Sequence, residues 1–230
     1  MMLEVLFDEE SINPKFGITL AERPVLPVSQ PRYTSYDVPG RNGKLTVFDG
    51  YDDVPYSLRF NYIDENAKPT FREIVNFLTG KTKVRLSDSD RYRVISQSII
   101  NVNNANNDIS EWCDFEIEII TEPFEYEDEE TSVFDGSGII INPSKIDAPI
   151  IINVYGDGDC NVRVNENQIQ LTGVQGHVTI DGILKNAYRG NMTQNNNMSG
   201  NYPSLSYGEN EVAISGNTKY IEIKKRWCWR

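Results

Sequence analysis

The chain has 230 residues, of which 39% are hydrophobic, and a formal net charge of −12. Its length allows one large or two modest domains, each with its own core, and 12 Tyr, 9 Phe and 3 Trp supply packing area for a globular protein. The acidic charge argues against a protein that binds nucleic acid by neutralising phosphates, although it is compatible with a surface past which DNA slides.

The three cysteines, Cys113, Cys160 and Cys228, are odd in number and far apart in sequence. This spacing excludes a disulfide framework and a zinc site, so we expect reduced cytoplasmic thiols. Acidic residues interrupt the N-terminal apolar run, and no stretch reaches transmembrane length. We therefore expect a soluble protein with no metal and no cofactor.

The first part of the chain predicts a short strand at 3–7, which Asn13-Pro14 ends. Three prolines between residues 24 and 31 favour an extended segment outside the centre of any sheet. Residues 33–38 and 44–48 predict the strands of a β-hairpin, with Asn42-Gly43 as a two-residue turn and Asp49-Gly50 as a second turn.

Apolar and polar residues alternate over 56–63, which predicts a half-buried strand. Residues 70–79 predict the one helix, because Thr70 and Glu73 have capping-box spacing and Gly80 stands at the expected C-terminal cap. The apolar stripe of this helix, which we expect to face the core, comprises Phe71, Ile74, Val75 and Leu78.

Further strands are predicted at 83–86, 91–100 and 115–119, with a polar loop at 101–107. Asp88 and Asp90 could be read as calcium ligands, but no further carboxylates follow at a suitable spacing, and a solvated turn is favoured. The acidic residues 122–130 predict an exposed linker. Residues 1–130 thus form a β-rich domain with one α-helix, and the boundary lies in this linker.

Residues 131–230 predict an antiparallel β-sandwich of short strands separated by Gly and Asn turns. The strands are expected at 150–155, 160–164, 169–171, 178–180, 211–215 and 220–224, with turns at 156–159 and 165–167 and a surface loop at 191–201. The overall fold class is therefore mainly β.

No catalytic constellation can be read from the sequence. His177 is the only histidine and no nucleophile signature accompanies it, so a structural histidine is favoured. Asp157 and Asp159 could bind calcium, but their Gly-Asp setting favours a turn. Trp227 and Trp229 lie on one face of the last strand; packing is favoured for Trp227, and sugar stacking stays open for Trp229. We predict no enzyme; a hydrolase with an unrecognised carboxylate pair is a distant alternative.

Two sets of segments carry a resemblance to a known family. Val38-Pro-Gly-Arg-Asn-Gly43, followed by a short strand and Asp49-Gly50, resembles the N-terminal domain of the distal tail proteins of long-tailed bacteriophages. In the second half, six segments are similar, in order, to the C-terminal domain of the same family: 152–159, 178–182, 186–188, 197–203, 208–210 and 221–227.

The resemblance implies that residues 131–230 form a galectin-like sandwich and that residues 1–130 build a homohexameric ring at the phage tail tip. Such a ring joins the tail tube to fibre or receptor-binding proteins, lets DNA pass, and is assembled in the host cytoplasm before it becomes part of the virion. The alternative is a carbohydrate-binding module or adhesin that acts through the C-terminal sandwich.

Overall fold

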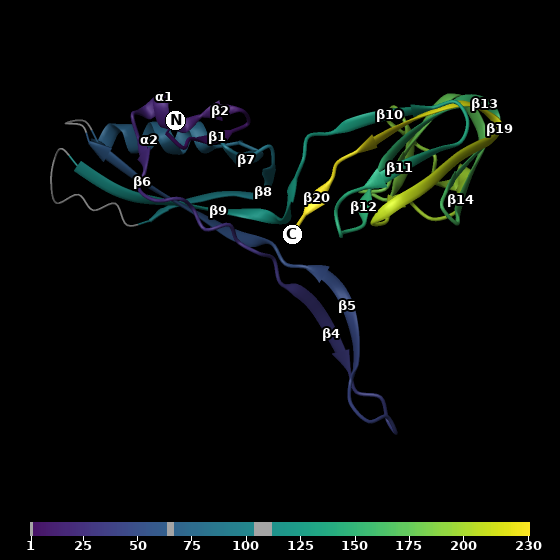
Figure 1. The fold of residues 1–230 in the computed structure, drawn as a ribbon, viewed down its shortest axis with the longest axis horizontal. Helices are drawn as coiled ribbons and strands as arrows, with labels where there is room; N and C mark the ends of the chain where they lie inside the picture. The colour runs from purple at the N-terminus through teal and green to yellow at the C-terminus, as the bar shows by residue number, and fades with distance from the viewer. Residues whose placement is uncertain (1, 64–66, 104–111) are drawn as a thin grey trace. The chain divides into compact units, whose positions relative to one another are not determined.

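A computed structural model describes residues 2–63, 67–103 and 112–230. The contacts divide the chain into two compact units, one of residues 1–126 with Arg230 and one of residues 127–229. Each unit has its own cluster of buried apolar side chains. Figure 1 shows that both units are built mainly of β-strands. None of the described helices is long and apolar enough to cross a membrane.

The first unit contains an antiparallel sheet of strand order β2-β1-β7-β8-β9-β6-β3. The alternation predicted for 56–63 is confirmed, because Tyr56, Leu58 and Phe60 are buried whereas Ser57 and Arg59 are exposed. The strands are β1 (Val5–Phe7), β2 (Glu10–Ser11), β3 (Thr19–Leu20), β6 (Val54–Ile63), β7 (Lys83–Leu86), β8 (Tyr92–Asn103) and β9 (Trp112–Tyr126).

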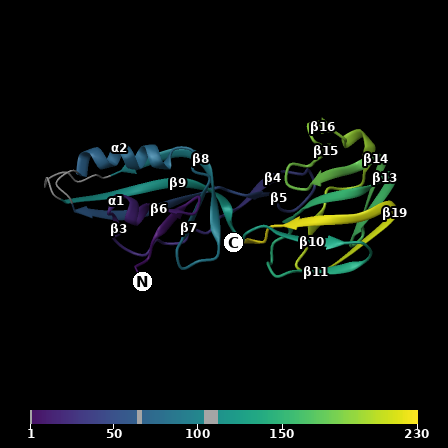
Figure 2. The same cartoon turned by 90° about the horizontal axis from the view of Figure 1, so that it is seen from above.

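Helix α2 (Ala67–Leu78) runs along one face of this sheet, as Figure 2 shows. The predicted start at Thr70 is wrong: the helix begins three residues earlier, with Pro69 in the first turn, where a missing N–H is tolerated. Ile74 is buried as predicted, but Val75 is 39% exposed, and Phe77 packs on the core instead. Gly80 has φ +82°, as its predicted capping role requires.

A second, short helix was not predicted. Asn13 and Pro14 do not end the first strand but belong to α1 (Ile12–Phe16). The strand ends at Phe7, where Asp8 and Glu9 form a turn with φ +46° and +68°. Pro14 is compatible with α1 because it lies in the first turn.

Two predicted irregular segments are instead parts of long strands. Residues 101–103 extend β8, and 104–107 lie outside the described residues. Residues 122–126 of the predicted linker extend β9, so the acidic segment without strand structure is 127–129. Pro123 is compatible with the strand because no residue opposite it in β6 or β8 is paired with it.

The predicted hairpin is present as β4 (Pro31–Tyr36) and β5 (Leu45–Tyr51), which form a separate two-stranded sheet. The predicted two-residue turn is wrong: Tyr36 pairs with Leu45, so the connecting loop spans 37–44, and Gly40 and Gly43 both have φ +79°. The predicted turn at Asp49-Gly50 is also wrong. Both residues lie within β5, beside a register shift between Arg32 and Tyr33 on β4.

The second unit has a sheet of order β10-β19-β13-β14-β15-β16, with β11 paired to β19 and β17 to β14, and a separate β12–β18 pair. All of these pairs are antiparallel. The strands are β10 (Glu130–Phe134), β11 (Gly138–Asn142), β12 (Ala148–Pro149), β13 (Ile151–Val164), β14 (Asn167–Asp181), β15 (Asn186–Arg189), β16 (Met192–Thr193), β17 (Met198–Ser199), β18 (Ser204–Leu205), β19 (Gly208–Lys225) and β20 (Cys228–Trp229).

Three of these strands each take the place of two predicted strands. The pairs of short strands expected at 150–155 and 160–164, at 169–171 and 178–180, and at 211–215 and 220–224 are the single strands β13, β14 and β19. The predicted turn at 156–159 is therefore wrong. Register shifts occur there instead, and irregularities of this kind bend a strand without ending it.

The predicted loop at 191–201 contains β16, β17 and a short 3-10 helix at Asn195–Asn197, but its side chains are mostly exposed, as expected of a surface segment.

One of the segments that carry the family resemblance, residues 208–210, has a structural explanation. Asn210, in Gly-Glu-Asn 208–210, is fully buried, and its side-chain amide donates to the carbonyl oxygens of Ser206 and Gly208. It thereby fixes the entry into β19.

Candidate functional site

The two aspartates considered as calcium ligands have structural partners. Asp157 Oδ1 accepts the N–H of Gly176 at 3.1 Å, and Oδ2 lies 2.8 Å from Lys219 Nζ. Asp159 Oδ1 accepts the N–H of Gly173 at 3.3 Å. The ion pair with Lys219 lowers the pKa of Asp157. Among the described residues, no group of three or more His, Cys, Asp or Glu side chains could hold a metal ion.

The other residues that the sequence suggested as possible site residues lie in separate parts of the structure. Asp88 lies in the turn between β7 and β8, as expected, where it pairs with Arg23 at 2.8 Å. Trp227 packs in the core of the second unit, as predicted, and Trp229 is half-buried. Cys160 and Cys228 are buried free thiols, and burial raises the pKa of each. Nothing is described of the Cys113 side chain.

His177 lies in a row of rings on the second unit. Cross-strand neighbours His177, Tyr155 and Tyr220 come from β14, β13 and β19. The Tyr155 and Tyr220 rings stack with centroids 4.4 Å apart, and His177 stacks on Tyr155 at 5.8 Å. The Tyr155 hydroxyl donates to Glu222 Oε2 at 3.0 Å. Partial burial, together with Glu222, raises the pKa of Tyr155.

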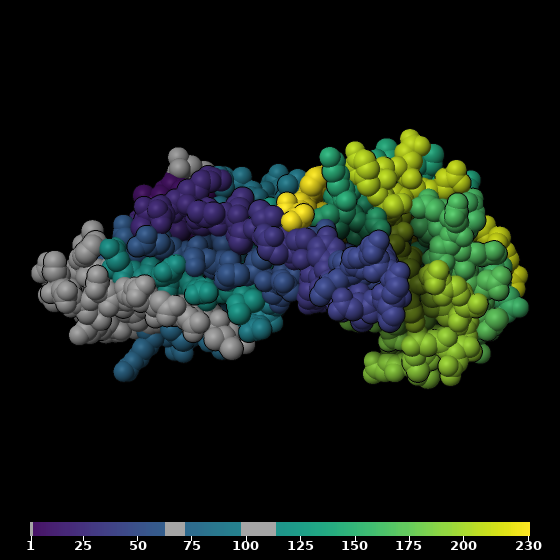
Figure 3. All heavy atoms as spheres, turned by 90° about the horizontal axis from the view of Figure 1, so that it is seen from below, coloured from purple at the N-terminus to yellow at the C-terminus, as the bar shows by residue number. Residues whose placement is uncertain are grey.

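The β4–β5 hairpin presents the most distinctive surface of the first unit. Six of its large apolar or aromatic side chains are between 39% and 56% exposed: Tyr33, Tyr36, Val38, Leu45, Val47 and Phe48. Figure 3 shows atoms of this segment, in dark blue, open on the face in view. Single exposed apolar side chains are ordinary, but a continuous group of them marks an interaction surface.

Both faces of the hairpin carry apolar groups. Tyr33 pairs with Phe48 and, three pairs along, Tyr36 pairs with Leu45. Residues that are directly paired share a face, and successive residues alternate, so these two pairs lie on opposite faces. Neither face of the ribbon is therefore the polar, solvated face that a surface hairpin normally has.

The root of the hairpin is anchored by aromatic and polar contacts within the first unit. Tyr51 packs edge-on against Phe124 of β9 with ring centroids 5.1 Å apart. Arg32 donates to the carbonyl oxygen of Asp49 at 3.2 Å, and the Arg230 guanidinium lies 5.3 Å from the Tyr51 ring centroid. The root is thus fixed while the side chains beyond it are exposed.

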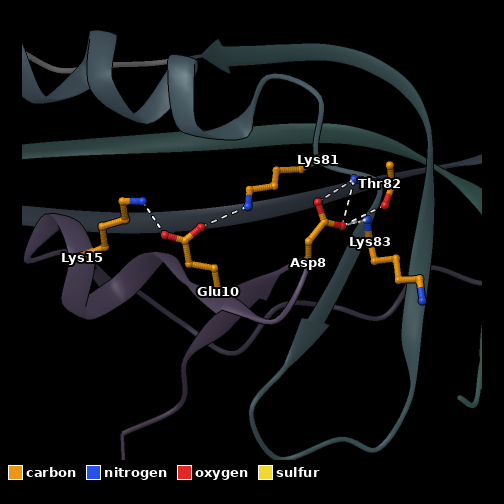
Figure 4. A network of polar contacts seen from close by, with 6 residues as sticks. All are labelled: Asp8, Glu10, Lys15, Lys81, Thr82 and Lys83. Atoms are coloured by element: carbon orange, nitrogen blue, oxygen red, sulfur yellow. Dashed lines mark hydrogen bonds and ion pairs between the residues drawn. The ribbon is translucent and has the colours of Figure 1, made fainter.

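The β1–β2 hairpin of the same unit is held quite differently (Figure 4). Asp8 Oδ1 accepts the backbone N–H groups of Thr82 and Lys83 at 3.1 and 2.9 Å, and the Thr82 hydroxyl at 2.8 Å. Glu10 pairs with Lys15 and, at 3.1 Å, with Lys81. The contact with Lys15, followed by that with Lys81, lowers the pKa of Glu10. These contacts tie the turn to the loop that follows α2.

The comparisons with known proteins identify the fold. A scan against protein-family models and a search of curated proteins gave no match. Among solved structures, the chain is similar to the SPP1 Dit (gp 19.1) protein, described as a paradigm of the hub adsorption apparatus in phages that infect Gram-positive bacteria. The two align at 10% identity over 99% of this chain and 100% of that chain, with a TM-score of 0.68.

Two structures of the phage P2 baseplate in its activated conformation, one with Ca and one with Sr, also align at 10% identity. They cover 99% and 97% of this chain, and 98% and 97% of theirs, with TM-scores of 0.49 and 0.47. The SPP1 alignment confirms the resemblance at the level of the fold: the chain has the mainly β fold of a phage distal tail protein.

The sequence located the hairpin but did not predict that its side chains are exposed. A usable signal is present: apolar residues occur at both odd and even positions of the strands, as at Tyr33 and Tyr36. In a strand with one solvated face, the apolar residues occupy either the odd or the even positions, but not both. Apolar residues at both odd and even positions therefore indicate that both faces of the hairpin are covered in some state of the protein.

Proposed function

We propose that the chain is a structural, non-enzymatic component of a phage tail tip, where copies of it assemble into a hexameric ring through the β4–β5 hairpin. The ring joins the tail tube to fibre or receptor-binding proteins, and DNA passes through its lumen. The observation that carries the proposal is the hairpin with apolar side chains exposed on both faces. Full-length similarity to the SPP1 Dit fold supports the location at the tail tip.

The physical argument for self-assembly rests on the hairpin itself. An isolated two-stranded hairpin is only marginally stable in water, and its unpaired backbone edges are open to another chain. Docking on a neighbouring copy would cover both the apolar faces and an edge. Because a hairpin and its docking surface are different parts of the molecule, the contact is head-to-tail, and a head-to-tail contact closes into a ring when its rotation permits.

The test compares two double variants by light scattering and negative-stain electron microscopy. Tyr33→Ser with Phe48→Ser removes aromatic area from the hairpin, whereas Ile139→Ser with Ile141→Ser removes similarly exposed apolar side chains, 60% and 62% exposed, from β11. We expect rings from the wild type and from the β11 variant, and monomers from the hairpin variant. Rings from the hairpin variant would contradict the proposed role of the hairpin, and a wild-type monomer at every concentration would contradict self-assembly.

Carbohydrate binding by residues 131–230 is a second candidate, favoured by the row His177, Tyr155 and Tyr220 beside the carboxylate of Glu222. Aromatic rings next to polar groups can offer a sugar both apolar contact and hydrogen bonds. In a glycan-array measurement, binding that is lost in Tyr155→Ala and Tyr220→Ala but kept in Tyr207→Ala, an exposed tyrosine outside this row, would support this candidate. An array with no bound glycan would remove it.

A further inference from the structure

A second feature of the first unit, independent of the hairpin, is a pocket of about 160 Å³ beside β7 and β8. Four arginines contribute to its wall: Arg23, Arg85, Arg91 and Arg93. Only two carboxylates, those of Asp88 and Glu125, line it with them. The pocket is therefore a cationic site in a chain whose formal net charge is −12.

Arg93 is the most constrained of these arginines, because only 5% of it is exposed. Its Nη2 donates to the carbonyl oxygen of Pro27 at 2.9 Å and lies 3.4 Å from Glu125 Oε1. Its Nε and Nη1 are buried and have no hydrogen-bond partner in the described part of the chain. The Nε of Arg85 is likewise buried without a hydrogen-bond partner among the described residues, although its Nη2 pairs with Glu9.

Such donors are costly to leave unpaired. A buried donor without an acceptor loses its hydration with nothing in return, and the cost is larger when the group is charged. The carboxylates of the pocket do not remove this cost, since Asp88 pairs with the exposed side chain of Arg23, and Glu125 lies beside Nη2 of Arg93 and leaves Nε and Nη1 unpaired. Burial lowers the pKa of Arg93, and Glu125 opposes this effect only in part. An additional acceptor would stabilise the site.

We propose that this pocket binds a carboxylate group, with Arg93 and Arg85 as the main donors and Arg23 at the rim. A carboxylate oxygen accepts charge-assisted hydrogen bonds from guanidinium N–H groups, and the unpaired Nε and Nη1 of Arg93 and Nε of Arg85 are donors of this kind. The volume holds a few water molecules or one small acid, and it is too small for a nucleotide.

The experiment is a titration followed by ¹H–¹⁵N NMR of the arginine Nε–H groups, with signals assigned by triple-resonance spectra of the isotope-labelled wild type. Sodium acetate is compared with sodium chloride at equal ionic strength, and Arg163 of β13, which pairs with Glu211, is the internal control. We expect acetate to shift the Arg93 and Arg85 signals to saturation while Arg163 stays unchanged. Shifts that chloride reproduces, or that Arg163 shares, would overturn the proposal.

A second titration uses a blocked glutamate peptide and distinguishes the source of the carboxylate. Saturation by acetate indicates that a free acid suffices, whereas saturation by the peptide alone indicates an acidic side chain of a protein; failure of both overturns the proposal. Because Arg93→Lys could unfold the unit, the test of affinity is Arg23→Gln at the exposed rim, with Arg163→Gln as the matched control. We expect Arg23→Gln to weaken binding about tenfold and the control to leave it unchanged.

Discussion

The β4–β5 hairpin and the β13–β14 hairpin are built from the same kind of alternating strands but differ in what covers them. In β13–β14, a two-residue turn joins Val164 to Asn167, a third strand pairs along β13, and alternate side chains such as Ile152 and Ile180 are fully buried. In β4–β5, an eight-residue loop joins two strands with which no other strand of the described residues pairs, and the apolar side chains are exposed.

The difference shows that alternation specifies a strand but not its burial. Burial depends on the strands and layers that come from elsewhere in the sequence, or from another chain. The β13–β14 hairpin finds this cover within its own unit. The β4–β5 hairpin does not, and this is the reason to place its cover on a second copy of the chain.

The largest expected effect separates the two hairpins directly. Ile152→Ala removes a fully buried side chain from β13, and it should lower the free energy of unfolding by about 2–5 kcal/mol. Val47→Ala on β5, where the side chain is 43% exposed, should change it by less than about 0.5 kcal/mol in the monomer. Urea unfolding of dilute protein measures both; equal losses would contradict the contrast.

A pH-dependent effect is expected from Tyr56, which alternates on β6 as the hairpin residues do but is buried. Burial raises the pKa of Tyr56 to about 12, whereas an unfolded tyrosine titrates near 10. Because the folded pKa is the higher one, this contribution to stability is complete below about pH 10 and is lost as the pH rises toward 12, by up to about 3 kcal/mol.

The measurement is the free energy of unfolding at pH 9 and at pH 12 for the wild type and Tyr56→Phe. The variant lacks the ionisable hydroxyl, so its stability should fall less over this interval. An identical fall in both proteins would show that the phenol of Tyr56 is not protected in the folded state.

A smaller effect is expected at the bend of β13. A Cβ added at Gly156 would lie 2.4 Å from the carbonyl oxygen of Asn217 and 2.6 Å from Cys160 Sγ. Gly156→Ala should therefore cost roughly 1–3 kcal/mol. Gly136→Ala is the matched control, since nothing lies within 4 Å of its added Cβ and its φ is not positive. Thermal unfolding compares the two, and an unchanged midpoint for Gly156→Ala would refute the close approach.

The smallest effect concerns the turn of the β1–β2 hairpin. Asp8→Ala removes the acceptor for the backbone N–H groups of Thr82 and Lys83, and it should cost about 1–2 kcal/mol. Asp8→Asn keeps an oxygen acceptor and tolerates the positive φ of +46°, so it should lose less. Urea unfolding ranks the two variants, and equal losses would mean that the charge, which both variants remove, holds this turn rather than the hydrogen bonds.

Much of the fold could be predicted from the sequence, because local patterns specify it. The alternation at 56–63 and the capping glycine Gly80 are examples. Strand lengths could not be predicted in the same way. Gly156 to Asp159 has the composition of a turn, yet β14 and β19 pair with the strand on both sides of it, and this pairing carries the strand through the bend.

The candidate sites were less accessible to sequence reasoning. Trp227 packs in a core as predicted, but the strand face on which the prediction rested is absent, because Trp227 lies in the connection between β19 and β20. The Arg93 pocket is formed by residues that are far apart in sequence, from Arg23 to Glu125, and that come together only in the folded structure. No local sequence pattern predicts it. The exposure of the hairpin could have been inferred from the sequence, because apolar residues occupy both odd and even positions of its strands.

The most direct test of the proposed assembly is the mass of the particle in solution, measured by light scattering for the wild type and for the Tyr33→Ser, Phe48→Ser variant. A wild-type hexamer together with a folded, monomeric variant is the predicted result. A variant that assembles as the wild type does would show that the exposed faces of the β4–β5 hairpin do not build the ring.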